Sequence, residues 1–319
     1  METTTLCERC ETPLEPGDLR CSICGQAAPL REELRRDVAV QILRCTGCGA
    51  AVAYDPAHQA PACSFCGAVM QVETQDDPLE QSQGYLPFTV DQDQARKSLR
   101  HWLGTLGWFR PDSLKSAAKI EHLTPIWWVG WVFDAEAHVC WAGDSNLDAG
   151  RSAWAPHAGQ TAMNFDDILV SASRGLTKKE VDVVAPGCDL SSVNDQPQGA
   201  AGATVEQFDL QRSQARQQIV YAIRQLADSR AAAEHIPGTN SRNVKASVIL
   251  RKLVTRRYSF PAYVLAYRYQ DRLYRVVICG QDARRLTGSA PYSIPKIILA
   301  AAAAAAALLI VAGIVMSAQ

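Results

Sequence analysis

Eight cysteines near the N-terminus are the residues of this sequence with the most definite chemistry. They form four Cys-x-x-Cys pairs, and glycine follows three of the pairs, at Gly25, Gly49 and Gly67. Such a turn directs backbone N–H groups at the thiolates, and glycine supplies its positive φ. Two facing pairs form a tetrahedral four-sulfur site for Zn²⁺. The sequence therefore predicts two zinc ribbons, with the ligands Cys7, Cys10, Cys21 and Cys24 in the first and Cys45, Cys48, Cys63 and Cys66 in the second.

Other arrangements of these cysteines stay open at this point. The pairs could cross-brace, with Cys7/Cys10 joined to Cys45/Cys48, and four cysteines could also hold an iron–sulfur cluster. A disulfide framework does not fit a cytosolic compartment, and a thioredoxin-like redox pair needs a βαβ frame that the sequence lacks. Residues 30–43 are expected to form a short helical spacer, which favours two separate sites. The single cysteines Cys140, Cys188 and Cys279 are expected to be small buried hydrophobic residues.

The elements that must position these ligands follow from composition and patterning. With 319 residues, 47% hydrophobic and 20% charged, the chain has enough apolar mass for a real core, which excludes a disordered chain, a collagen and a long coiled coil. Residues 126–141 alternate with period two and predict a long strand or a hairpin with a buried aromatic face. Residues 154–165 predict a return strand, and 244–258 and 261–279 further strands. Helices are expected at 91–106, capped by Asp91 with Gln94, and at 211–235.

The C-terminal residues 297–316 carry no charge and are long enough, at about 1.5 Å per residue, to cross a bilayer. Three residues follow, so the pattern predicts a tail anchor. The positive-inside rule then places residues 1–296 in the cytoplasm, at the inner membrane of the cell. The expected organisation is α+β, with a first zinc ribbon at 1–28, a helical spacer and second ribbon at 29–70, a linker at 71–84, a mixed α/β domain with an antiparallel sheet at 85–293, and a single transmembrane anchor at 294–319.

Charge is distributed unevenly along the chain. Residues 1–70 sum to −3, residues 71–241 to −8, and residues 242–319 to +10. We expect the basic end to face anionic lipid headgroups. The residues assigned to this membrane surface are Arg251, Lys252, Arg256, Arg257, Arg284, Arg285 and Lys296.

The ribbons themselves are acidic, and each Zn²⁺ held by four thiolates adds a formal charge of −2. Phosphate binding needs positive charge, so the ribbons are expected to contact protein rather than nucleic acid. A membrane-tethered zinc-ribbon module that binds nucleic acid is the alternative function.

Catalytic motifs are missing from the sequence. No Gly-x-Ser-x-Gly elbow, no His-Glu-x-x-His helix and no Gly-x4-Gly-Lys-Ser/Thr phosphate loop occurs, and the six histidines are scattered. We therefore expect no enzymatic activity, and no small-molecule substrate is evident.

Short motifs in a fixed order carry a family resemblance. They are Leu86-Pro87-Phe88, Trp102 with Trp108 and Pro111, Phe133-Asp134-Ala135, Asp166 to Val170 with Ser173, Ala266-Tyr267-Arg268-Tyr269, Gly280-Gln281 and Pro291-Tyr292-Ser293. With the cysteine pairs they cover most of residues 1–296. The chain resembles bacterial membrane-anchored tandem zinc-ribbon proteins, often labelled TFIIB-type zinc ribbon or primosomal-protein-N′-like. The family tends to have Asn-Gly-Gln-Thr-Gly where this chain has Cys279-Gly280-Gln281-Asp282-Ala283.

The resemblance implies a function as well as a layout. Members of the family are companions of SPFH-domain and phage-shock-type proteins in envelope stress. The resemblance therefore implies an adaptor that recruits partner proteins of this kind at the cytoplasmic face of the membrane. The helicase label does not fit, because the chain has no phosphate loop for ATP.

Overall fold

The computed structural model describes residues 5–15, 18, 20–29, 40–53, 62–63, 65–75, 80–148, 153–200, 202–210 and 212–317. Within these ranges the structure confirms the expected mixed α/β architecture. It has antiparallel sheets and two groups of four cysteines near the N-terminus.

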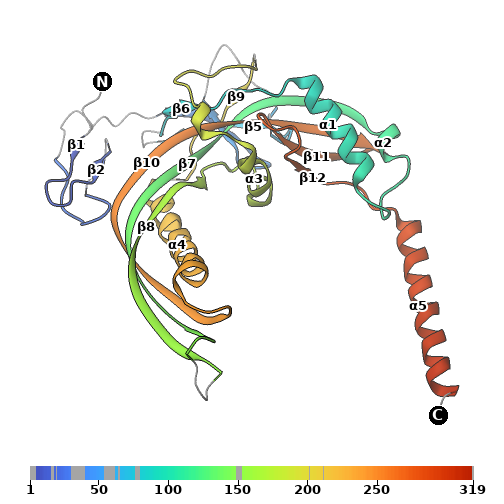
Figure 1. Ribbon diagram of the computed structural model, residues 1–319. Helices are drawn as coiled ribbons and strands as arrows, with labels where there is room; N and C mark the ends of the chain where they lie inside the picture. Colours follow the sequence, from blue (N-terminus) through green and yellow to red (C-terminus); the bar gives the residue numbers. More distant parts are fainter. Residues whose placement is uncertain are drawn as a thin grey trace.

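One arched sheet dominates the molecule (Figure 1). Its main path runs β12–β11–β10–β7–β8, with the short strands β6 beside β10 and β9 beside β7. The bounds are β6 Gly84–Tyr85, β7 Lys119–Ser145, β8 Ala155–Ser171, β9 Thr204–Val205, β10 Ser241–Tyr269, β11 Arg272–Cys279 and β12 Leu286–Gly288.

The two longest strands set the size and curvature of the sheet. β7 has 27 residues and β10 has 29, and they pair antiparallel from Lys119↔Arg268 to Ser145↔Ser241. A straight strand of that length would extend about 90 Å. Three register shifts interrupt this pairing, and irregularities of this kind bend and twist a sheet. The long strand at 126–141 and the return strand at 154–165 are confirmed, whereas the two strands expected from residue 244 to 269 form one.

Helix α4, Arg212–Arg230, lies along the concave face of the arch (Figure 1). Ala215, Ile219, Ile223 and Ala227 recur at helical spacing and are fully buried against a cluster that includes Trp131. A π-helical turn, Ala231–His235, ends the helix. The helix predicted at 211–235 is confirmed over the residues that the structure describes.

At the other end the sheet is covered on both faces. The covering helices are α1 Gln92–Thr105, α2 Leu114–Ala117 and α3 Lys178–Val184, with short 3-10 turns at Ala185–Gly187 and Leu190–Ser192. Along β11, Val276 and Ile278 pack with the α1 side, and Val277 and Cys279 pack with the α3 side. This is the period-two alternation of a strand buried on both faces. The predicted capping box of Asp91 and Gln94 is confirmed.

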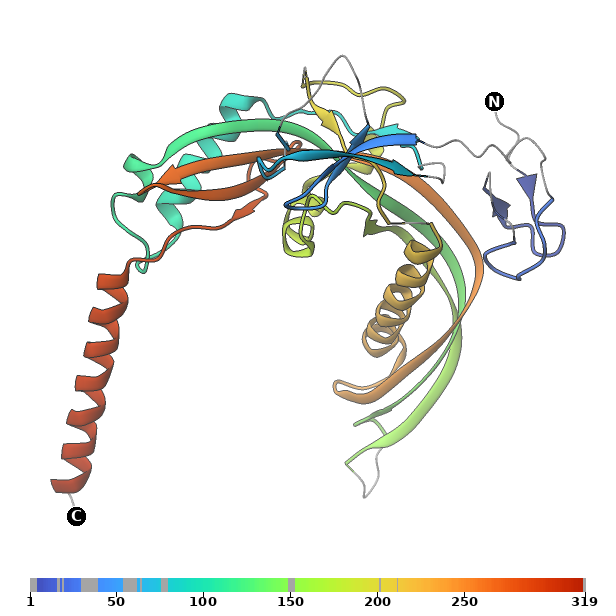
Figure 2. The ribbon, with the colours of Figure 1, turned by 180° about the vertical axis from the view of Figure 1, so that it is seen from behind.

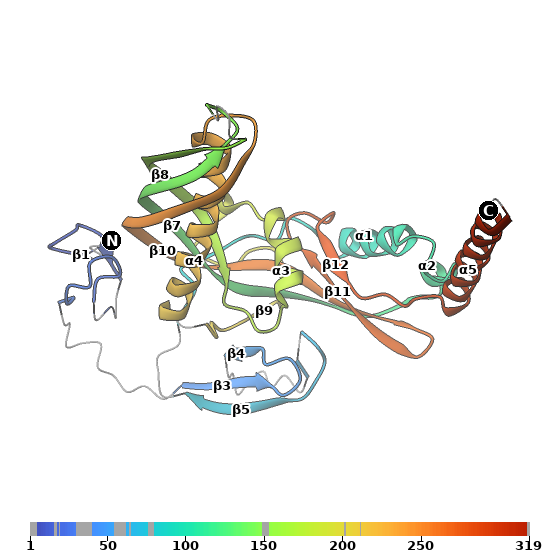
Figure 3. The same cartoon turned by 90° about the horizontal axis from the view of Figure 1, so that it is seen from below.

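The N-terminal region forms two small sheets. The first pairs β1 Thr5–Leu6 with β2 Pro13–Leu14, and the second has the order β4–β3–β5, from β3 Val40–Cys45, β4 Ala51–Ala53 and β5 Met70–Gln75. Figure 3 shows the second sheet beside the arched sheet.

Two expectations for this region are wrong where they can be compared. Residues 40–43 of the expected helical spacer are strand, and residues 30–39 lie outside the described residues. Residues 71–75 of the expected linker belong to β5.

Helix α5, Ile294–Ser317, leaves the body on its own (Figure 2). Ile298, Leu299, Leu308 and Leu309 each expose more than 60% of their surface. The expected span at 297–316 lies partly outside the described side chains, which end at residue 310. Over the part of the chain that the structure describes, no helix is long and apolar enough to cross a membrane.

Candidate metal centres

The four cysteine turns share one backbone geometry. In each, the residue after the second cysteine donates its N–H to the carbonyl of the first, at 2.8–3.1 Å. Gly25, Gly49 and Gly67 hold φ of 72°, 78° and 76°, as the sequence predicted. In the first turn Glu11 takes this place with φ 56°, a left-handed conformation that a glutamate enters at a cost. The same fold of the chain is therefore built four times from local sequence.

The turns meet in adjacent pairs rather than cross-braced ones. In the first group the Cys7–Cys24 and Cys10–Cys21 sulfurs are 3.6 and 3.5 Å apart. In the second, the Cys45–Cys66 and Cys48–Cys63 sulfurs are 3.4 and 3.7 Å apart. An ion with metal–sulfur bonds of about 2.3 Å would hold its ligands about 3.8 Å apart at the corners of a tetrahedron. Both groups therefore fit a four-coordinate metal ion.

Backbone N–H groups are directed at the sulfurs. Gly47 donates to Cys45 Sγ at 3.3 Å and Phe65 to Cys63 Sγ at 3.3 Å, while in the first group Ile23 lies 3.5 Å from Cys21 Sγ. Such donors stabilise the thiolate form that a metal requires and fix the direction of its lone pairs.

The second group is part of the main hydrophobic core. Cys45, Cys63 and Phe65 belong to the same buried cluster as Trp128. Phe65 lies between two ligands, is 2% exposed and packs directly on Gly175, where an added Cβ would sit 2.2 Å from its ring. The second metal site and the core of the arched sheet therefore share side chains.

Polar contacts strengthen this attachment. Gln207 N donates to Ala51 O at 2.8 Å, and Arg44 Nη1 lies 2.8 Å from Asp209 Oδ1. Glu206 forms an isolated bridge with Val52 and is only 2% exposed. Burial raises the pKa of Glu206 to about 8, although Ser173 and the N–H groups of Gly175 and Arg174 act in the opposite direction.

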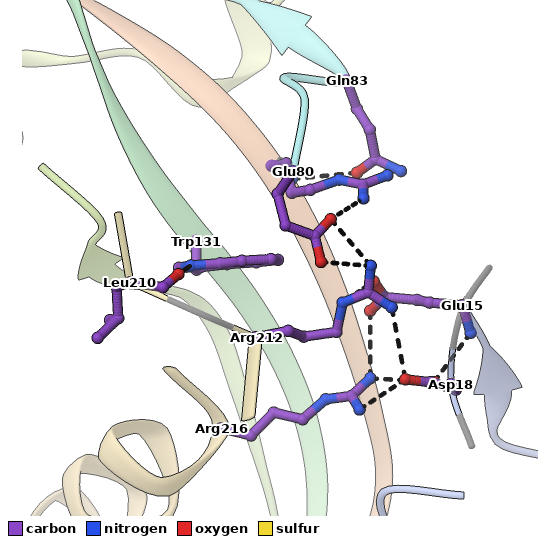
Figure 4. Close-up of polar contacts among 9 residues, drawn as sticks. Glu15, Asp18, Glu80, Gln83, Trp131, Leu210, Arg212 and Arg216 are labelled. Carbon is purple, nitrogen blue, oxygen red and sulfur yellow. Dashed lines mark hydrogen bonds and ion pairs between the residues drawn. The ribbon is translucent and has the colours of Figure 1, made fainter. Parts of the chain in front are cut away.

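The first group is attached differently, mainly through ions, and also by Ile23, which packs on the cluster that α4 covers. Its small core contains Cys7, Leu14 and Cys21. Arg216 lies 2.9 Å from Asp18 and 3.4 Å from Glu15, and Arg212 lies 3.3 Å from Glu15 and 3.4 Å from Asp18. Figure 4 shows both guanidinium groups extending from the start of α4 to the loop between the two cysteine turns.

Glu80 completes this cluster. It pairs with Arg212 at 2.7 Å and with Arg257 of β10. None of the three arginine or three carboxylate side chains is more than 22% exposed. We call these six residues, Glu15, Asp18, Glu80, Arg212, Arg216 and Arg257, the ion cluster. It joins the first cysteine group to α4 and β10.

The basic residues assigned to a membrane surface are mostly paired with carboxylates. Arg256 lies 2.5 Å from Asp134 and 3.0 Å from Asp167, and Lys252 lies 3.3 Å from Glu136. Arg257 belongs to the ion cluster, Arg284 pairs with Asp282 at 3.0 Å, and Lys296 pairs with Asp112 at 2.5 Å. Arg251 is exposed on β10, and Arg285 packs its methylenes near Gly187. The polar face of β7 is thus a network of ion pairs.

The expected burial of the single cysteines is confirmed for Cys279, holds in part for the half-buried Cys188, and is wrong for Cys140. Cys140 is exposed on β7. Cys188 and Cys279 are not alone, because their sulfurs lie 3.6 Å apart although 91 residues separate them. Hydrogen bonding with Cys188 lowers the pKa of Cys279 to about 7, and the same contact raises that of Cys188. No spacing in the sequence signals this pair, since the fold brings a loop after α3 onto the end of β11.

Comparison with known proteins adds no identity. No family model matches the chain, and neither a curated protein nor a solved structure shows significant similarity to it.

Proposed function

We propose that this chain is a membrane-anchored zinc-ribbon adaptor that recruits a partner protein at the cytoplasmic face of the membrane. The observation that carries the proposal is the pair of four-cysteine groups in two settings. One group is built into the core and the other is held on the surface by the ion cluster. A group of the second kind is suited to presenting a contact surface, because the ion cluster holds it to the body while side chains such as Leu6 stay exposed.

Zinc is the metal we assign to both groups. Four thiolates in tetrahedral array are the usual donors of structural Zn²⁺ in small domains. The N–H donors at the sulfurs fit this role, and the residues that would hold the two ions are the eight cysteines named above. Bound zinc would supply folding free energy rather than reactivity, since all four ligand positions are taken by protein.

Helix α5 supports the membrane tether. Residues 297–316 carry no charge, and the described part of the helix exposes apolar side chains that the body does not cover. In Figures 1 and 2 the first cysteine group and α5 lie at opposite sides of the body. An anchored molecule would therefore hold the first group away from the bilayer, where a cytosolic or membrane-associated protein can reach it.

The surface of the first group favours a protein partner over nucleic acid. Leu6 is 52% exposed beside the exposed Glu8, Arg9 and Glu11. Outside the ribbons, Lys252, Arg256 and Arg257 are paired with carboxylates, so they are poorly placed to neutralise phosphates. SPFH-domain and phage-shock-type proteins remain the partner class that the family resemblance implies.

Metal content and partner capture test the proposal together. Full-length protein purified from membranes should contain two zinc ions per chain by elemental analysis, and Cys7→Ser with Cys10→Ser should contain one. Cross-linking in the membrane should capture a protein partner that Leu6→Asp loses with its zinc content unchanged. Tyr221→Asp, on the exposed face of α4, is the matched control. Iron in place of zinc, or capture unaffected by both changes at the first group, would contradict the proposal.

A further inference from the structure

The segment that precedes helix α5 is fastened to the loop at residues 107–112. Ser293 N donates to Phe109 O at 2.8 Å, Arg110 Nη1 donates to Pro291 O at 3.1 Å, and Lys296 Nζ donates to Arg110 O at 3.1 Å. The ion pair of Lys296 with Asp112 adds a fourth contact. The base of α5 and this loop are therefore one structural unit, although their contacts join positions 180 to 186 apart in the sequence.

Three aromatic side chains are held outward by this unit. Trp108 is 52% exposed, Phe109 48% and Tyr292 63%. The rings of Trp108 and Phe109 meet edge to face with centroids 5.3 Å apart, Arg110 stacks over Tyr292 at 3.8 Å, and Lys296 Nζ lies 5.7 Å from the Trp108 ring. We call Trp108, Phe109, Tyr292, Arg110 and Lys296 the aromatic collar.

The chemistry of the aromatic collar matches one environment. Tryptophan and tyrosine prefer the boundary between the hydrocarbon core and the headgroups, where a ring is in apolar surroundings and its polar edge is wet. Arginine and lysine beside them interact with lipid phosphates while their methylenes cover apolar surface. Water alone is a poor solvent for three grouped aromatic rings, and such patches mark interaction sites.

We propose that the aromatic collar lies in the headgroup layer of the bilayer and sets the depth and tilt of the protein on the membrane. The occupant we assign is lipid, because the collar lies beside the start of α5, where the exposed apolar run from Ile294 and Ile297 begins. This inference rests on the proposed membrane tether and deepens it. It implies that the arched sheet is fixed relative to the bilayer rather than hanging from a free linker.

The basic residues at the collar and those on β10 differ in their partners. Arg110 has ring and carbonyl partners at the collar itself, so its charge is placed beside α5, whereas Lys296 is also paired with the exposed Asp112. Arg256 and Lys252 lie in the part of β10 that pairs with residues 132–136 of β7, where carboxylates neutralise them. Lipid contact is therefore assigned to the collar and not to the middle of the sheet.

Tryptophan quenching by brominated lipid tests the inference in the full-length chain. Of the seven tryptophans, Trp108 is the most exposed, and the other six are buried or half-buried. In phosphatidylcholine–phosphatidylglycerol vesicles brominated near the headgroups, we expect the wild type to be quenched and Trp108→Phe to lose most of that quenching. Trp154→Phe, whose ring stacks with Arg242 at the far end of the sheet, should leave it unchanged.

The outcomes separate the collar from the tether. Protein that floats with vesicles but shows equal quenching in the wild type and in Trp108→Phe would overturn the collar and leave the tether standing. Protein that neither floats nor is quenched would overturn the tether and, with it, the collar. If Trp108 is instead shielded by a second copy of the chain, sedimentation of lipid-free protein in detergent will show a dimer that Trp108→Phe weakens, which would also overturn the inference.

Discussion

The carboxyl group of Glu206 has the most clearly perturbed acidity outside the cysteines. Burial between the sheet and the second cysteine group raises its pKa to about 8, far above the unfolded value of about 4.3. The folded state therefore keeps a proton that the unfolded chain has lost at neutral pH. Stability from this group is fully present below about pH 4.3, falls as pH rises to about 8, and is level above that.

Replacing Glu206 with glutamine should remove this dependence. Between pH 5 and 8 the free energy of unfolding of the wild type should fall relative to Glu206→Gln by about 1.4 kcal/mol per pH unit at most. Urea titrations at several pH values measure the difference, in which the pH dependence of the metal ligands cancels. Glu136→Gln, at a carboxylate 56% exposed, should run parallel to the wild type. Parallel curves for Glu206→Gln would contradict the assigned protonation.

At the residue scale the sequence predicts the ligand sets well and their surroundings poorly. The cysteine spacing identifies both groups, and the glycines after three pairs correctly predict positive φ. The Cys188–Cys279 contact could not be predicted, since it depends on two loops meeting in space. The burial of Glu206 was equally hidden, because nothing in its neighbours along the chain distinguishes it from a surface carboxylate.

The elements that attach the first cysteine group are the loop before Cys21 and the first turns of α4. Removing Arg216 leaves Asp18, only 6% exposed, without its nearest cation at 2.9 Å. Asp18 keeps Arg212 at 3.4 Å, so the cost stays below the roughly 3 kcal/mol of a fully broken buried pair. We therefore expect Arg216→Met to loosen the first group by less than that amount.

Hydrogen exchange over residues 5–29 measures this loosening directly. Asp18→Asn should cost less in the Arg216→Met background than in the wild type, since the two residues act as a pair. Arg224→Met, at an exposed position of the same helix, should change protection little. If the two substitutions are additive, the ion cluster does not hold the first group.

Patterning predicts regular elements and fails at short apolar runs. Periodicity over many residues identifies α1, α4, β7 and β8, and the capping box fixes the start of α1. Residues 40–43 were expected to be helical because a charged helix-like stretch precedes them, yet they pair with β4 and β5. A short run with three apolar residues in four does not distinguish helix from strand, so tertiary pairing decides.

For the molecule as a whole, the two metal sites should differ in what their loss does. Cys45→Ser with Cys63→Ser removes ligands that belong to the main core, and we expect loss of cooperative folding of the arched sheet. Cys7→Ser with Cys21→Ser should leave that sheet folded, because the first group has a small core of its own. Near-ultraviolet circular dichroism of the buried tryptophans measures the difference. Equal loss of signal in both variants would show that the two groups fold as one unit.

The pairing of β7 with β10 has a consequence for how the chain folds. One edge of β7, residues 119–145, has no hydrogen-bond partner until residues 241–269 are in place. The central contacts of the sheet join positions about 100 to 150 residues apart. Closing such long loops costs entropy before any contact is gained, which slows folding. The hairpin of β7 and β8 is local and can form first, but its aromatic face has no cover until α4 follows, and the other edge of β7 has no partner until β10 follows. The arrival of β10 is therefore the step that commits the chain to its native topology.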